Sequence, residues 1–326
     1  MRSIRFLEDL PGIQERLFLD MKKWIVLVSG ISLLFAACKN DSATKNGADS
    51  INNKTLRISV DESFQPVITE QVKVFESSYP DTRVIAEYKP EADCIRDLEK
   101  DSTKLVIISR ELSPDETKYF NSKIEYKPEF GQLAEDAVAV IVNVNSRDSV
   151  FTVDELRQLL AGKGSKNLSI AIDGNSATST VRYLRDSVLK GAPFGKNITG
   201  AKNSEDLINY IAATPGAVGF VGISWMTNPQ SKEQEQALTK VKMGLIECQN
   251  CDKDVFAKPS QQTITFKQYP LVRGLYYVLK ENYAGLGSRF VQFITTERGQ
   301  LIFRRALLVP TRMGFNRRTT NIKETE

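Results

Sequence analysis

The sequence predicts an α/β protein whose mainly parallel sheets are flanked by helices. Strand-like and helix-like segments alternate from Leu56 to about residue 306, an order typical of βαβ units. Two of the strand-like segments, KLVIIS at 104–109 and DAVAVIVN at 136–143, are apolar almost throughout, as expected for strands that are buried on both faces. Because 326 residues can bury a sizeable core, we expect two lobes or domains.

The first part of the chain is expected to form three strands and three helices. The helix ahead of residue 120 has the clearest start, because Ser113 and Glu116 have the spacing of a capping box and Pro114 suits the first helical position. The expected elements are a strand at 56–60, a helix at 66–80, a strand at 82–88, a short helix at about 91–100, a strand at 104–109 and a helix from Ser113.

The second part continues the alternation. Thr152 and Glu155 again have capping-box spacing, and Gly162 marks the end of their helix. Residues 226–262 are polar and irregular apart from one expected strand. The expected elements are strands at 136–143, 168–172, 216–223, about 240–246 and 271–280, and helices at 152–162, from near Thr180, at about 203–213 and within 286–306.

Composition excludes several classes of function. The chain has no histidine, which removes Ser-His-Asp and Cys-His catalysis, HExxH metal sites and imidazole acid/base chemistry. Its net charge is only +4, from 44 basic and 40 acidic residues that are scattered along the chain, so no nucleic-acid partner is expected. We also expect no cofactor and no metal site.

The N-terminus has the layout of an exported lipoprotein. Residues 21–38, MKKWIVLVSGISLLFAAC, contain two lysines, a short apolar run and two alanines before a cysteine, which predicts a signal peptide at 21–37. LFAAC is similar to the bacterial lipobox, although Phe35 stands where Leu is usual, and this similarity implies lipidation of Cys38. An uncleaved anchor helix is the alternative. Residues 1–20 fit neither a signal peptide nor an anchor helix, and they suggest an upstream extension before a start at Met21. Residues 38–54 are polar and predict a flexible tether.

The stretch IDGNSATSTVRYL, 172–184, places small hydroxyl residues between an apolar strand and a helix. Such a turn presents backbone N–H groups and hydroxyls to a tetrahedral oxyanion. The alternative is that Ser176 or Ser179 only caps the helix.

Two other strand ends carry polar residues. Ser109, Arg110 and Glu111 follow the strand at 104–109, at the carboxyl end where open α/β sheets bind ligands. The guanidinium group of Arg110 can donate two hydrogen bonds to an oxyanion, or it can form a surface ion pair with Glu111. Ser63 and Phe64 follow the first strand and precede a helix that starts near Pro66, and a plain helix start is the alternative here.

Cys248 and Cys251 form a CQNC motif in the polar region. In an exported protein this spacing favours a local disulfide or free thiols over a thioredoxin-type site. Further zinc ligands are not evident, since Cys94 supplies one at most.

The order of these segments resembles the substrate-binding proteins of bacterial phosphate ABC importers, which have the two-lobe type II periplasmic-binding-protein fold. The resemblance extends over about residues 55–315. The blocks that carry it are SREL at 109–112, AEDAVAVIVN at 134–143, TVDELRQLLAGK at 152–163, PGAVGFVGI at 215–223, YPLVRGLYYVL at 269–279 and FVQFITTERGQ at 290–300.

This resemblance implies where an anion is held. By position, the family's binding residues fall on Ser63 and Phe64, on Ser109 and Arg110, and on Ser176, Ala177 and Thr178, with Ser179 and Arg182 beside them and Glu111 as a proton acceptor. The sequence departs from the family at EYKPEADC, 87–94, which replaces a Gly-Ser-Ser turn, and at Ile172, where Arg is common.

The resemblance also implies the arrangement of domains and the function. Lobe one would comprise about 55–137 plus 263–317 and lobe two 138–262, joined by two hinge crossings, with a C-terminal tail at 318–326. We expect a lipid-anchored protein of the cell envelope, facing the periplasm or the exterior, that binds phosphate or a similar oxyanion and delivers it to an ABC transporter permease. The alternative is an envelope sensor or protein-interaction lipoprotein without transport. An enzyme is not expected, because no SxxK motif begins a helix to support Ser-Lys chemistry.

Overall fold

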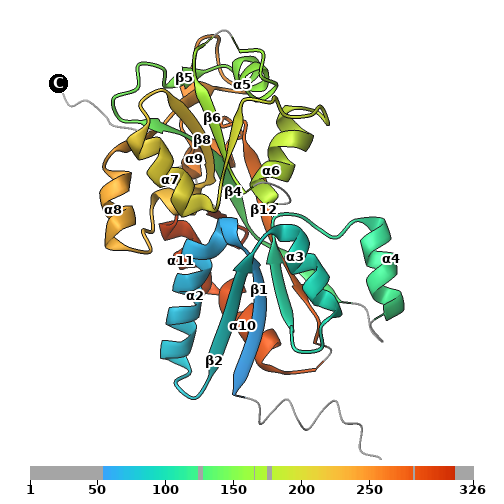
Figure 1. Ribbon diagram of the computed structural model, residues 1–326. Helices are drawn as coiled ribbons and strands as arrows, with labels where there is room; N and C mark the ends of the chain where they lie inside the picture. Colours follow the sequence, from blue (N-terminus) through green and yellow to red (C-terminus); the bar gives the residue numbers. More distant parts are fainter. Residues whose placement is uncertain (1–53, 124–127, 165, 175–177, 282, 313–326) are drawn as a thin grey trace, which may run out of the picture. The chain divides into compact units, whose positions relative to one another are not determined.

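The computed structural model describes residues 54–123, 128–164, 166–174, 178–281 and 283–312, which all belong to one compact unit. Ten strands are hydrogen-bonded in the order β2-β1-β3-β12-β4-β8-β6-β7, with β9 and β13 beside β4 (Figure 1). These strands are β1 (Thr55–Asp61), β2 (Arg83–Lys89), β3 (Leu105–Ile108), β4 (Glu129–Asn143), β6 (Ser169–Asp173), β7 (Ile198–Ala201), β8 (Ala217–Gly222), β9 (Val241–Met243), β12 (Val272–Leu279) and β13 (Val309–Pro310).

The strand β4 divides the sheet into two lobes. Its first part, up to Ala137, pairs with β12, and its second part, from Val138 to Val142, pairs with β8. We call the part with β1, β2, β3 and β12 lobe one and the part with β6, β7 and β8 lobe two. The chain passes between the lobes within β4 and again just before β12, where Val138 N donates to Leu271 O at 2.9 Å. The predicted two-lobe α/β fold is therefore confirmed.

Parallel pairing is found where the sequence predicts βαβ units. β1 is parallel to β2 and β3, and β6 is parallel to β7 and β8. The long strands β4 and β12 run antiparallel to their neighbours. The carboxyl ends of β1, β3 and β6 consequently lead into loops at the junction of the lobes.

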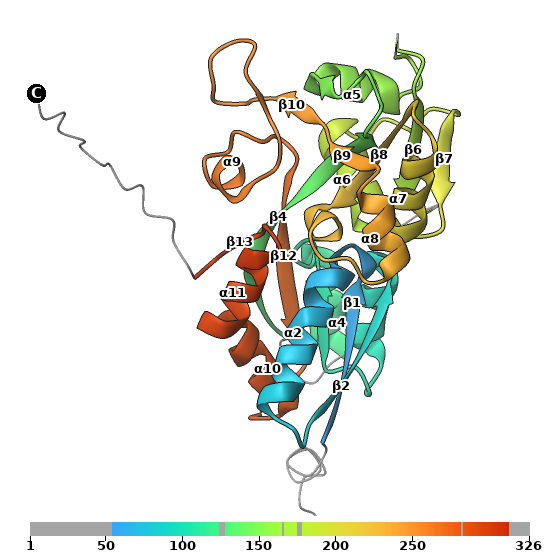
Figure 2. The same cartoon turned by 90° about the vertical axis from the view of Figure 1, so that its left-hand side faces the viewer.

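Helices cover both faces of the sheet in lobe one. α2 (Gln65–Ser78), α10 (Leu286–Thr295) and α11 (Glu297–Arg305) pack on one face (Figure 2), where Phe75 meets Phe290 edge to face at 5.0 Å. α3 (Glu91–Arg96), a 3-10 helix at Asp97–Glu99 and α4 (Pro114–Lys123) pack on the other. β3 explains this arrangement, because Leu105 and Ile107 enter the first core while Val106 and Ile108 enter the second.

Lobe two has the same layering. β4 sends Val138, Val140 and Val142 to one core and Ala139 and Ile141 to the other. The first core is covered by α5 (Val153–Leu160), α6 (Ser179–Tyr183), a π-helical turn at Leu184–Val188 and α9 (Gln261–Thr265). The second is covered by α7 (Ser204–Ala213) and α8 (Lys232–Leu238).

The predicted helix starts are confirmed by their hydrogen bonds. Thr152 Oγ1 accepts from Glu155 N at 3.0 Å while Glu155 Oε2 accepts from Thr152 N at 2.8 Å, which completes the capping box. Ser113 and Glu116 form the same reciprocal pair at α4. Gly162 has φ +72°, a conformation that favours glycine at a helix end.

The polar region around 226–262 contains more structure than the sequence indicates. It includes α8 and the strands β10 (Leu245–Glu247) and β11 (Phe256–Ala257), which form a small sheet with the earlier strand β5 (Val150–Phe151). Strands this short have too few residues to show a period of two, so local pattern does not reveal them. Cys248 and Cys251, just after β10, form a disulfide. In the described part of the chain no helix has the length and apolarity that a membrane span requires, and the predicted signal peptide and Cys38 lie outside that part.

Candidate functional site

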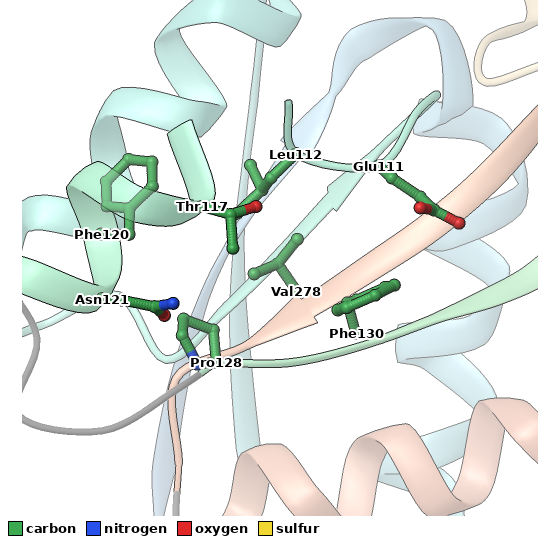
Figure 3. Close-up of a pocket in the computed structure, with 8 residues that line it drawn as sticks. All are labelled: Glu111, Leu112, Thr117, Phe120, Asn121, Pro128, Phe130 and Val278. Atoms are coloured by element: carbon green, nitrogen blue, oxygen red, sulfur yellow. The ribbon is translucent and has the colours of Figure 1, made fainter. Parts of the chain in front are cut away.

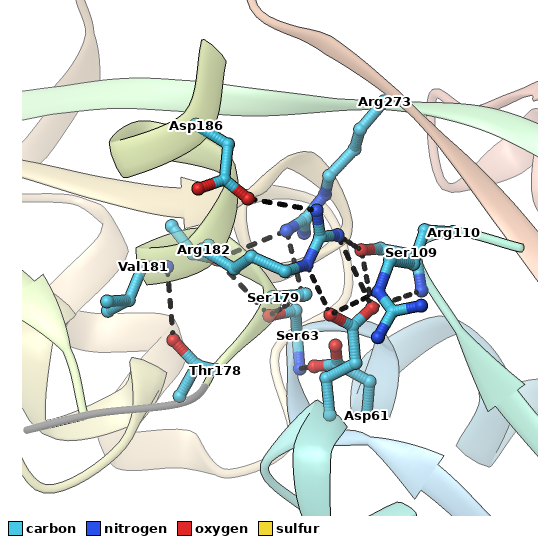
Figure 4. A network of polar contacts seen from close by, with 12 residues as sticks. Asp61, Ser63, Ser109, Arg110, Thr178, Ser179, Val181, Arg182, Asp186 and Arg273 are labelled. Atoms are coloured by element: carbon cyan, nitrogen blue, oxygen red, sulfur yellow. Dashed lines mark hydrogen bonds and ion pairs between the residues drawn. The ribbon is translucent and has the colours of Figure 1, made fainter. Parts of the chain in front are cut away.

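The polar cluster predicted from strand ends lies where the two lobes meet (Figure 4). β1 ends at Asp61 and leads into Ser63, β3 leads into Ser109, and β6 leads toward α6, whose first residue is Ser179. Ser63 and Ser179 are fully buried. Ser63, Ser109 and Ser179 thus come from three different strand ends, as the predicted sheet requires.

Direct hydroxyl contacts join the lobes. Ser179 Oγ donates to Ser63 Oγ at 3.1 Å, and Ser63 Oγ lies 3.2 Å from Thr180 Oγ1. Ser63 N donates to Asp61 Oδ1 at 2.9 Å, which fixes the turn after β1. The hydroxyls that would serve an oxyanion are therefore hydrogen-bonded to one another in this structure.

Arg273, which the sequence analysis did not single out, reaches this cluster from β12. Its Nη1 donates to Ser179 Oγ at 2.9 Å and to Thr180 Oγ1 at 3.3 Å, and its Nε donates to Asp136 Oδ2 at 2.8 Å. The guanidinium lies 4.9 Å from the centre of the Phe64 ring. Its Nη2, although buried, has no hydrogen-bond partner among the described residues. A charged residue inside the apolar strand LVRGLYYVL is the signal that sequence reasoning missed.

Arg182, which the resemblance places beside the anion site, reaches the junction. Its Nε donates to Glu91 Oε2 at 2.6 Å and its Nη2 donates to Ser109 Oγ at 2.6 Å. Glu91 Oε1 also accepts from Ser109 N at 2.9 Å and from Ser109 Oγ at 2.7 Å. Glu91 belongs to EYKPEADC, so the segment that departs from the family pattern places a carboxylate at the junction.

Thr178 caps α6, so Ser179, which the capping alternative named, is the first helical residue instead. Its Oγ1 accepts from Val181 N at 3.2 Å and donates to the backbone oxygen of Asp173 at 3.1 Å. Ser176 and Ala177, the other two residues of the predicted turn, lie outside the described residues.

Arg110 lies at the edge of the cluster (Figure 4), whereas Glu111 lies in a different part of the molecule. The guanidinium of Arg110 forms two hydrogen bonds with the carboxylate of Glu116, at 2.7 and 2.8 Å, and its Nε lies 3.9 Å from Glu91 Oε2. Glu111 lines a separate cavity of about 40 Å³ beside Phe120 and Phe130 (Figure 3). The helix start that follows β3 explains the difference, because Glu116 of α4 lies within reach of Arg110.

A second polar link between the lobes involves Glu62. Glu62 Oε1 accepts from Ser204 Oγ at 2.7 Å and from Ser204 N at 3.1 Å. Ser204 Oγ also lies 3.1 Å from Asp173 Oδ2, to which it can donate. Glu62 and Asp173 therefore share one serine at the first turn of α7.

The carboxyl groups of the junction have shifted pKa values. Burial raises the pKa of Asp61 to about 7, and the charge of Glu91 adds to the shift. Burial also raises the pKa of Glu62 to about 7, with the charge of Asp173 as the next cause. Glu91 differs: burial alone would raise its pKa, but the charge and hydrogen bonds of Arg182 and Ser109 hold it below its usual value.

These groups make the junction rich in both signs of charge. Both lobes contribute buried carboxyls, which are Asp61, Glu91, Asp136 and Asp173. Arg182 forms an ion pair with Glu91 and Arg273 forms one with Asp136, while the partly buried Glu62 shares Ser204 with Asp173. Asp61 directly precedes the buried serine cluster, and its Oδ2, although buried, has no hydrogen-bond partner among the described residues. No group of acidic and cysteine side chains in the described residues is arranged to hold a metal ion.

Comparison with known proteins agrees with the fold. The model of the PBP superfamily domain matches residues 43–298. The chain is 22% identical over 297 residues to the phosphate-binding protein PstS of Borreliella burgdorferi, covering 86% of this chain and 95% of that protein. It is 21% identical over 291 residues to the phosphate-binding protein PstS of Bacillus subtilis, covering 84% and 88%.

Solved structures show the same architecture. A protein of Clostridium perfringens crystallised with bound phosphate has a TM-score of 0.64 and 17% identity, over 79% of this chain and all of that chain. An ABC-type phosphate transport receptor from Vibrio cholerae has a TM-score of 0.57 and 16% identity, over 78% and 99%. At these identities the likeness concerns the fold.

Proposed function

The chain belongs to the PBP superfamily, and on that premise we propose that it is an extracytoplasmic solute-binding protein that captures phosphate or a similar tetrahedral oxyanion between its lobes for an ABC importer. The curated relatives are phosphate-binding proteins. No catalytic step belongs to this function.

The observation that carries the proposal is the convergence of hydrogen-bond donors from both lobes. Ser63 comes from lobe one, Ser179 and Thr180 come from lobe two, and Arg273 donates to the latter two. Hydroxyl and guanidinium donors around one point suit an anion with several acceptor oxygens. An oxyanion between the lobes would replace the hydroxyl-to-hydroxyl contacts with bonds to its own oxygens.

The hydrogen-bond donors at the junction are numerous enough for micromolar affinity toward an oxyanion. Micromolar binding requires about −8.2 kcal/mol, and hydrogen bonds to charged groups contribute roughly 1.5–3 kcal/mol each. Several such bonds supply that affinity. We assign Asp61, in place of Glu111, as the group that accepts the proton of a hydrogen phosphate, because its carboxyl lies beside Ser63 and its buried Oδ2 has no hydrogen-bond partner among the described residues.

The remaining parts of the proposal concern the ends of the chain and the partners. We keep residues 21–37 as a signal peptide and Cys38 as the lipidated residue that anchors the protein to a membrane, with 38–54 as the tether. The lobe bounds of about 55–137 plus 263–317 and 138–262 also remain a proposal, with the second crossing moved to just before β12 because Ile264 and Leu271 pack in the core of lobe two. The ABC transporter permease would receive the anion from the cleft between the lobes.

Isothermal titration tests the binding function. The purified protein is titrated with phosphate, sulfate and molybdate, and we expect micromolar binding of phosphate or a related oxyanion. Ser179→Ala should weaken that binding about tenfold, since one hydrogen bond to a charged group is lost. Ser122→Ala, at an exposed serine of α4, should leave it unchanged. No heat with any oxyanion would contradict the proposal.

One observation favours a second candidate function. The lobes already contact each other through protein groups, including Glu91 with Arg182 and Glu62 with Ser204. This closed arrangement suits an envelope sensor or protein-interaction lipoprotein that does not transport. This candidate would be supported if isothermal titration with oxyanions gave no binding heat and if cells that lack the protein took up phosphate at the unchanged rate.

A further inference from the structure

Glu91 receives the set of hydrogen bonds that a bound anion would receive. Its side chain is almost fully buried, and its two oxygens accept from a backbone N–H, a hydroxyl and a guanidinium. The donors are Ser109 N, Ser109 Oγ and Arg182 Nε (Figure 4). Backbone N–H, hydroxyl and arginine donors in this combination are typical of carboxylate and phosphate recognition.

The edge of Arg182 that would form a bidentate pair is already occupied. Its Nε donates to Glu91 Oε2 at 2.6 Å, and its Nη2 donates to Ser109 Oγ at 2.6 Å and lies 3.5 Å from Glu91 Oε1. An arginine presents this pair of nitrogens as a fixed fork. A second anion therefore cannot take the same edge while Glu91 stays.

The contact also connects the two lobes. Glu91 begins α3 and Ser109 follows β3, both in lobe one, whereas Arg182 lies on α6 in lobe two. An ion pair between lobes holds them together in the way that a shared ligand would. Glu91 is thus both a competitor for the oxyanion donors and a bridge that closes the lobes.

We infer that Glu91 is an internal carboxylate ligand that occupies the oxyanion donors Arg182 and Ser109, so that a phosphate-like anion binds only as Glu91 leaves them. This inference rests on the proposed function, because it concerns how the same cleft takes its anion. Two like charges about 4 Å apart repel strongly inside a protein, so the carboxylate lowers the affinity for any anion nearby. Affinity is set by this competition as well as by the donors themselves.

Glu91→Gln is the direct test. The amide oxygen still accepts from Ser109, but the amide nitrogen meets Arg182 Nε as donor against donor, and the negative charge is gone. We expect Glu91→Gln to bind phosphate at least tenfold more tightly than the wild type by isothermal titration. The matched control is Asp93→Asn on the same helix, where the acid pairs with the exposed Arg96. Its affinity should stay within twofold of the wild type.

Small-angle X-ray scattering in phosphate-free buffer gives a second readout. Without the Glu91 bridge the lobes should separate, so that Glu91→Gln has a larger radius of gyration than the wild type and Asp93→Asn. Addition of phosphate should reduce that radius again if the variant binds it.

The outcomes separate this inference from the binding function. If the wild type binds phosphate and Glu91→Gln binds no more tightly, the inference is overturned and the function stands. If neither the wild type nor the variants bind any oxyanion, the proposed binding function is wrong, and the scattering experiment then tests the Glu91–Arg182 bridge. A larger radius of gyration for Glu91→Gln supports the bridge, and an unchanged radius overturns it.

A measurement on the wild type covers the case in which Glu91→Gln does not fold. The Arg182 Nε–H signal, assigned by its loss in Arg182→Lys, is followed in ¹⁵N spectra during phosphate titration. The signal must shift as the anion displaces Glu91. A signal that stays in place at saturating phosphate overturns the inference.

Discussion

At the scale of single residues, Arg273 is the group on which the polar contacts of the junction converge. It forms an ion pair with Asp136, and both side chains are almost completely shielded from solvent. A buried charge that loses its partner is costly, because neither water nor another group replaces the interaction. Arg273 therefore stabilises the fold in addition to its proposed role toward an anion.

Arg273→Met should lower the free energy of unfolding by about 3–5 kcal/mol, since it leaves Asp136 buried without its partner. Urea denaturation followed by circular dichroism measures this loss. Arg57→Met is the control, because Arg57 is half exposed on β1 and lies 3.7 Å from Glu87. Exposed pairs contribute about 0–1 kcal/mol. A loss from Arg273→Met as small as that of the control would contradict the assignment.

At the scale of elements, α5 begins where local sequence predicts it, whereas the long strand β4 extends further than predicted. α5 begins at its predicted capping box, because the box involves residues only three positions apart. β4 starts at Glu129, well before the apolar run at 136–143 that predicted it. Its first part, EFGQLAE, is polar enough to resemble a loop, and only pairing with β12 makes it a strand. Local capping is predictable, while pairing between distant segments is not.

Thr152→Ala should lower the free energy of unfolding by about 1 kcal/mol, because it removes the hydroxyl that accepts from Glu155 N. Chemical denaturation gives the value. Thr239→Ala, at an exposed threonine just after α8, is the matched control and should change stability by less than about 0.5 kcal/mol. Equal effects at the two sites would show that the capping box does not contribute.

At the scale of the whole molecule, docking of the two lobes brings acidic groups together. Asp61 and Glu62 come from lobe one, and Asp173 comes from lobe two. The resulting burial raises the pKa of Asp61 and of Glu62 to about 7. In an unfolded chain the pKa of such carboxyls is about 4. Between these values the folded state binds more protons than the unfolded state, so stability should fall as pH rises through this window.

The double variant Asp61→Asn/Glu62→Gln should weaken this pH dependence. Each carboxyl contributes a slope of up to about 1.36 kcal/mol per pH unit between its unfolded and folded pKa. The loss of unfolding free energy from pH 5 to pH 7 should therefore be smaller in the double variant than in the wild type. Urea denaturation at the two pH values measures it.

The control for the pH experiment is Asp81→Asn/Asp115→Asn, which removes two exposed acids of lobe one. Its pH dependence should match the wild type. A double variant at Asp61 and Glu62 that keeps the full wild-type slope would show that these two carboxyls do not hold the extra protons.

The sequence by itself determined the order of the main strands and helices, the two-lobe α/β fold and the three strand ends at which Ser63, Ser109 and Ser179 lie. These features depend on periodicity, capping and strand direction, which are local or follow from the fold class. The sequence did not predict the short elements β5, β7, α8, β11, α9 and β13. It also did not indicate that Arg110 pairs with Glu116 or that Glu111 lies beside Phe120 and Phe130, because these contacts depend on how α4 packs against the sheet.

Only the tertiary structure decided which charges face one another. Glu91 and Arg182 are 91 residues apart, and Arg273 and Asp136 are 137 apart. Such pairs form when lobe docking and strand pairing bring the residues together. In this protein that packing brings the buried carboxylate of Glu91 onto Arg182 and Ser109, because a buried carboxylate requires a partner and Arg182 is within reach.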